Sequence, residues 1–164
     1  MKVNDRYCSF YYENDDDYGT IEIEPEKTAL LIIDAEYACV KRPQPENPSP
    51  AELENIARWE PFYEKYDKVI IPNLQRLISL CRRTGIEVTY AKIQGFKSNG
   101  RDRSLDQKVS GFNQFLVTSG DHRGDIIQEI APQKEDIVVT KTTDSALTGT
   151  NLRLILHNLS LIHI

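Results

Sequence analysis

An acidic residue directly after an apolar run is the first feature of this sequence that could do chemistry. The stretch KTALLIIDAEYAC (residues 27–39) places Asp34 behind five consecutive apolar residues. A buried carboxylate is costly unless a cation or a hydrogen-bond donor meets it. A second apolar run, DIVVTK (residues 136–141), ends in Lys141, which can supply that charge. The two residues therefore predict an ion pair, which either serves catalysis or only caps two strands.

The elements that would position these charges are predicted to form a parallel sheet. The run before Asp34 is continuously apolar, which is typical of a strand covered on both faces. Further strands are predicted at residues 86–93, 136–141 and 160–164. Alternation of strands and helices predicts an α/β fold with a central parallel β-sheet flanked by helices. Because the carboxyl ends of parallel strands meet at one edge, Asp34 and Lys141 should reach the same cleft.

Four helical segments are expected between the strands. The first begins at Ser49 or Pro50, after a proline-rich loop. The second carries an apolar stripe through residues 66–84 and stops at Gly85, and Pro72 should kink it or lie in its first turn. Shorter helices are predicted at residues 124–132 and 149–159.

Size and charge restrict the class of protein. A chain of 164 residues, 40% of them hydrophobic, fits one domain. We place this domain at residues 28–164. Residues 1–27 are predicted to form an N-terminal arm that contains a short edge strand at residues 20–24. The net charge of −5 argues against a nucleic-acid partner. No stretch approaches the roughly 20 apolar residues of a membrane span, and the first residues lack the pattern of a secretion signal. We therefore expect a cytoplasmic protein without a membrane partner.

The cysteines and histidines indicate neither a disulfide framework nor a metal site. The three cysteines lack CxxC spacing, and the three histidines lie at no ligand-like spacing, so we predict no metal and no cofactor. Cys81 lies on the apolar stripe and is expected in the core, and Cys8 lies in the arm. Cys39 follows Asp34 by five residues and could approach the cleft. No glycine-rich phosphate loop follows the first strand, which disfavours a nucleotide-binding module.

Three stretches resemble the isochorismatase-like cysteine hydrolase family: TALLIIDAEY, GIEVTYAKI and DIVVTKTTDSALTGTNLRLILHNL. The resemblance runs from about residue 20 to the last residue. It implies a three-layer, Rossmann-like α/β fold and an Asp-Lys-Cys triad that hydrolyses amide C–N bonds, or a vinyl ether in some members. It also implies that Asp34 is the general base and later acid, and that Lys141 orients Asp34. The stretch GRDRSLDQKVSGF (residues 100–112) is similar to members that act on linear ureido and amide compounds, such as ureidoacrylate and biuret.

The third member of the triad is expected on a cysteine after the strand that begins at residue 160. It is not present, so we expect a chain that is incomplete at its C-terminus, inactive alone and homo-oligomeric when complete. The alternative is that this strand ends the domain at a sheet edge, in a non-catalytic ligand-binding or assembly module. The family commonly has Gln two residues after the Asp, whereas Glu36 stands here. This second carboxylate would change the charge around Asp34 or alter substrate choice.

Contacts to a small amide or ureido substrate are predicted from the loops after the strands. A guanidinium can fork onto a substrate carboxylate, and the loop after the second strand carries two arginines. The predicted substrate-binding residues are Gln94, Arg101, Arg103 and Thr142. The alternative is a solvated charged loop in which these side chains contact no ligand.

Overall fold

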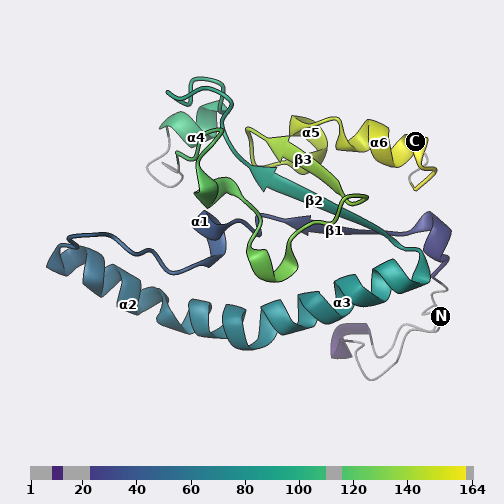
Figure 1. Ribbon diagram of the computed structural model, residues 1–164, viewed down its shortest axis with the longest axis horizontal. Helices are drawn as coiled ribbons and strands as arrows, with labels where there is room; N and C mark the ends of the chain where they lie inside the picture. Colours follow the sequence, from purple (N-terminus) through teal and green to yellow (C-terminus); the bar gives the residue numbers. More distant parts are fainter. Residues whose placement is uncertain (1–8, 13–22, 110–115, 162–164) are drawn as a thin grey trace.

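A three-stranded parallel sheet lies at the centre of the protein (Figure 1). The computed structural model describes residues 9–12, 23–109 and 116–161. The strands follow the order β1-β2-β3 and pair in parallel, with Ile33 opposite Ala91 and Ile93 opposite Lys141. Their bounds are β1 (Ala29–Ile33), β2 (Glu87–Ile93) and β3 (Ile137–Lys141). The predicted parallel α/β sheet is therefore confirmed.

Helices cover both faces of this sheet, so the fold has three layers. Figure 1 shows α3 (Ile71–Thr84) along one face, and α5 (Ala146–Gly149) and α6 (Leu152–Asn158) along the other. One buried cluster joins α3 to β1 and β2, and it includes Ile32, Tyr90, Ile78 and Cys81. A second cluster joins α5 and α6 to β2 and β3, and it includes Ala91, Val139, Leu152 and Leu156. The two clusters contact β1 from both faces, but Ile32 is its one buried residue, Ile33 is 48% exposed, and β1 lies at the end of the described sheet rather than at its centre.

The layer on the first face is one long helical rod. Helix α2 (Pro50–Lys65) passes through a π-helical turn (Tyr66–Ile70) directly into α3. It begins as predicted, because Ser49 and Glu52 form a reciprocal capping box. Pro72 lies in the first turn of α3, directly after the π-helical turn, and Gly85 ends the helix in the left-handed conformation at φ 79°. Leu77, at the margin of the predicted stripe, is exposed.

The structure differs from the prediction at two segments that were expected to be helices, residues 124–132 and 149–159. Residues 124–132 form no α-helix but only 3₁₀ turns at His122–Gly124 and Gln128–Ile130. Their backbone groups are used elsewhere, because Ile126 makes an antiparallel bridge to Glu36 and the Ile127 N–H donates to the Ala35 carbonyl. The predicted helix at 149–159 is also wrong in its bounds, because α5 and α6 are separate elements.

The remaining elements are short or lie partly outside the described residues. Residues 20–22 of the predicted edge strand are not described, and residues 23–24 precede a 3₁₀ turn. The predicted fourth strand lies largely outside the described residues, which end at Leu161. Short helices α1 (Tyr37–Val40) and α4 (Leu105–Val109) follow β1 and β2. Across the described ranges, no helix combines the length and the hydropathy that crossing a membrane requires.

Candidate active site

The structure brings Asp34 and Lys141 together at the carboxyl edge of the sheet. Asp34 directly follows β1, and Lys141 is the last residue of β3. The Lys141 ammonium lies 2.8 Å from the Asp34 carboxylate, so the ion pair reaches across the central strand β2. Within the described part of the chain, neither atom of this contact has another hydrogen-bond partner. Asp34 is thus the single described counter-ion of this lysine.

The two members of the pair differ sharply in burial. Lys141 is 0% exposed, whereas the Asp34 side chain is 44% exposed. A buried ammonium requires a close anion, because its loss of hydration is large. The carboxylate of Asp34 can meet water or a small molecule from outside while Lys141 compensates its charge from inside. This arrangement suits proton transfer at the outer face of the carboxylate.

The backbone at Asp34 adopts an uncommon conformation. Its φ is 56°, in the left-handed region that few residues other than glycine occupy. Aspartate is among the side chains that tolerate this region, and the Asp34 N–H still donates to the Ala91 carbonyl at 3.1 Å. The chain therefore turns immediately after β1 while it stays attached to β2. Strained backbone of this kind is concentrated at functional sites.

A second carboxylate, that of Glu36, is buried next to this pair. Glu36 is 1% exposed, and its Oε1 accepts a hydrogen bond from the Ile93 N–H at the end of β2. Its Oε2 is buried and has no hydrogen-bond partner among the described residues. Burial raises the pKa of Glu36 to about 7, and the charge of Asp34 adds to the effect, against the Ile93 hydrogen bond and the charge of Lys141. The family resemblance marked Glu36 as unusual, and the structure adds that its side chain is buried and that its backbone forms a bridge to Ile126.

The described cysteines are poor nucleophiles at neutral pH. Cys39 lies on α1, near the charged groups of the site. Burial of the thiol, and after it the negative charges of Glu36 and Asp34, raise the pKa of Cys39 to about 12. Burial also raises the pKa of Cys81, which packs in the core under the sheet. A thiol attacks as a thiolate. Neither residue therefore matches the chemistry of an activated cysteine.

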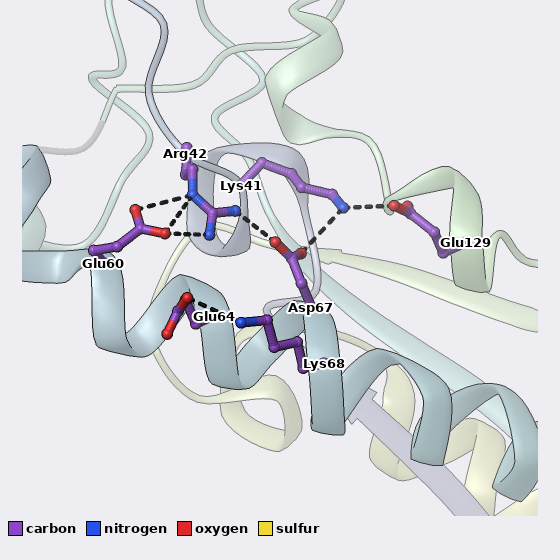
Figure 2. Close-up of polar contacts among 7 residues, drawn as sticks. All are labelled: Lys41, Arg42, Glu60, Glu64, Asp67, Lys68 and Glu129. Carbon is purple, nitrogen blue, oxygen red and sulfur yellow. Dashed lines mark hydrogen bonds and ion pairs between the residues drawn. The ribbon is translucent and has the colours of Figure 1, made fainter.

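Ion pairs fasten the end of α1 to the long helical rod (Figure 2). Arg42 contacts Glu60 at 2.6 Å and Asp67 at 2.5 Å, and Lys41 lies 2.5 Å from Glu129 and 3.8 Å from Asp67. Asp67 on the π-helical turn is thus shared by both cations. This network holds the end of α1 against the helical rod and against the 3₁₀ turn at Gln128–Ile130.

The four predicted substrate-binding residues lie in different environments. Gln94 follows β2, is 9% exposed and donates its amide to the Thr118 carbonyl. Arg101 is exposed on the loop, whereas Arg103 is half-buried and donates to the Gly100 carbonyl. The Thr142 carbonyl accepts the Ser104 N–H, which ties this loop to the end of β3.

Among the residues that the structure describes, no three His, Cys, Asp or Glu side chains are grouped so as to hold a metal ion. The site described above consists of two carboxylates and one ammonium, supported by backbone hydrogen bonds.

The fold and the paired charges define an α/β protein with a polar site at the carboxyl edge of its sheet. A sequence model of the Isochorismatase domain matches residues 28–164. The chain therefore belongs to the isochorismatase family. A curated relative, the isochorismatase of Bacillus subtilis (strain 168), is 36% identical over 80 residues, which cover 49% of this chain and 24% of the relative.

Solved structures with the same fold include two hydrolases. A cysteine hydrolase from Pseudomonas syringae pv. phaseolicola 1448A has a TM-score of 0.63 and 21% identity, covering 85% of this chain and 57% of its own. An N-carbamoylsarcosine amidase from Thermoplasma acidophilum has a TM-score of 0.51 and 20% identity, covering 80% of this chain and 61% of its own. At these identities the likeness establishes the fold. The chain spans about a quarter of the curated relative and about three fifths of the solved ones.

Proposed function

We propose that this chain supplies the acid–base half of a cysteine-dependent hydrolase that cleaves C–N bonds in small amide or ureido compounds. The observation that carries the proposal is the ion pair between Asp34 and Lys141 at the carboxyl edge of the sheet. Membership of the isochorismatase family and the fold shared with a cysteine hydrolase support it. The roles below are those that the chemistry of such a hydrolase requires.

Asp34 acts as the general base and then as the general acid. Its carboxylate accepts the proton of the attacking thiol, which attacks only as thiolate. Lys141 stabilises the charged carboxylate until that transfer and then balances the charge that develops. Attack on the carbonyl gives a tetrahedral oxyanion, for which backbone N–H groups are the usual donors. Asp34 returns its proton to the leaving amine, and water hydrolyses the resulting thioester.

The nucleophile is assigned to a cysteine encoded after residue 164. Two findings support this part of the proposal. The described cysteines, Cys39 and Cys81, both have raised pKa values, so their thiolates are scarce at neutral pH. The chain also spans only 57% and 61% of the two solved hydrolases. We expect the 164-residue chain to have no turnover by itself.

A ureido or carbamoyl compound with a carboxylate is our first choice of substrate. One protein with this fold is an N-carbamoylsarcosine amidase. Arg101 and Arg103 can approach a substrate carboxylate from the loop that Ser104 ties to Thr142. Gln94, at the end of β2, shapes the site without binding the substrate through its amide N–H, because that group already donates to the Thr118 carbonyl.

Ammonia release from N-carbamoyl amino acids and simple amides tests this function in the complete protein. Asp34→Asn and Lys141→Ala should each lower kcat/KM by at least about a hundredfold, since they remove the proton acceptor and its counter-ion. Glu64→Gln and Lys68→Ala alter an exposed ion pair on α2 and the adjoining π-helical turn and serve as matched controls. Undiminished turnover in both site variants would remove Asp34 and Lys141 from the mechanism. Absence of turnover in the unaltered complete protein would favour a non-catalytic ligand-binding or assembly module.

A further inference from the structure

The site contains two carboxylates but a single described cation. Lys141 forms its ion pair with Asp34, and its ammonium has no other hydrogen-bond partner among the described residues. Glu36 is more deeply buried than Asp34, so water cannot stabilise its charge. An ionised Glu36 would therefore be a buried charge without a cation of its own, which is strongly unfavourable.

The hydrogen bond that Glu36 accepts leaves its second carboxyl oxygen available for a proton. Oε1 accepts the Ile93 N–H, which leaves Oε2 as the oxygen that can carry a proton. In this form Glu36 has one acceptor oxygen and one donor group, the same pattern as the side chain of glutamine. The antiparallel bridge between the backbones of Glu36 and Ile126 fixes where this group can lie.

We propose that Glu36 is a positioning residue that works in its protonated form, so that the charge of Lys141 is left entirely to Asp34. The inference rests on the proposed function. When Glu36 loses its proton, a second carboxylate competes for Lys141, and Asp34 is held less firmly in its charged, oriented state. The catalytic pair is therefore intact below neutral pH and becomes increasingly impaired as the pH rises through neutrality.

The groups that face Glu36 are few and can be named. Asp34 and Lys141 lie at the ends of β1 and β3, Cys39 lies on α1, and Tyr66 lies on the π-helical turn. Burial raises the pKa of Tyr66 above its ordinary value, and that of the Cys39 thiol to about 12, so both remain neutral between pH 6 and 8. Glu36, with a pKa of about 7, changes its charge within this range, whereas Tyr66 and Cys39 do not.

The first test compares Glu36→Gln with the unaltered sequence in the complete protein, using hydrolysis of an N-carbamoyl amino acid. The measured quantity is the kcat/KM of Glu36→Gln divided by that of the unaltered protein at each pH. Ionisable groups that are common to both proteins cancel in this ratio. We expect this ratio to rise about tenfold from pH 6 to pH 8, since the protonated fraction of an acid with a pKa near 7 falls about tenfold there. A purely structural role would shift the ratio equally at every pH. A constant ratio overturns the proposal, and Glu64→Gln should give a constant ratio.

The second test needs no turnover, so it separates this inference from the proposed function. The protein is labelled with ¹³C at its glutamate side-chain carboxyl groups and titrated by NMR. We expect one resonance with a midpoint near pH 7 that is absent from Glu36→Gln. If every glutamate titrates near its ordinary pKa, Glu36 is ionised in the working protein and the proposal fails, whatever the enzyme assay gives. The titration of the unaltered protein decides this even if the variant does not fold.

Discussion

Replacing Glu36 by glutamine should change how the stability of the protein depends on pH. Glu36 is 1% exposed, and its pKa rises from 4.5 in the unfolded chain to about 7 in the folded protein. The folded state then holds a proton that the unfolded state has released. Its contribution to stability is fully present below pH 4.5 and is lost as the pH rises through 7. A difference of this size corresponds to about 3 kcal/mol.

The measurement is the free energy of unfolding from urea titrations, followed by circular dichroism between pH 4.5 and pH 8. We expect Glu36→Gln to match the unaltered protein near pH 4.5, because glutamine keeps the acceptor for the Ile93 N–H. Toward pH 8 the variant should become more stable than the unaltered protein by about 3 kcal/mol. Glu64→Gln, at an exposed ion pair, is the matched control and should give a nearly parallel curve. A Glu36→Gln curve that also runs parallel would refute the reasoning.

Three further predictions follow from individual contacts. Asp34→Asn should destabilise the protein by about 3 kcal/mol or more, because it removes the counter-ion of the fully buried Lys141 ammonium. Lys141→Met should cost clearly less, because the remaining Asp34 carboxylate is partly hydrated. Thermal unfolding that ranks the two variants in the reverse order would contradict this prediction. Gly149→Ala should cost about 1–3 kcal/mol in urea titrations, since the new Cβ would clash with the Thr143 methyl, and adding Thr143→Ser should recover most of the loss. Cys39 should react with iodoacetamide at pH 8 far more slowly than free cysteine in peptide mapping, because burial raises its pKa to about 12; equal rates would disprove that burial effect.

Much of the fold could be predicted from the chain alone, because local signals agreed with the tertiary structure. A continuous apolar run gives β1, and a capping box at Ser49 with a left-handed glycine at Gly85 marks the ends of the helical rod. Alternation of strands and helices then implies a parallel sheet, in which strand ends share an edge. The meeting of Asp34 and Lys141 follows from this rule, although they are distant in sequence.

What the sequence determined by itself was therefore the three strands, the long helical rod on one face and the two charges at strand ends. The tertiary structure decided which groups lose contact with water. Residues around Ile126 were predicted to be helical, but their backbone pairs with the segment after β1 at the buried Glu36. No local pattern encodes such a bridge, because both partners are irregular segments far apart in the chain. Burial, in turn, sets the charge of Glu36, since the free energy of a carboxylate depends on its surroundings more than on its neighbours in sequence.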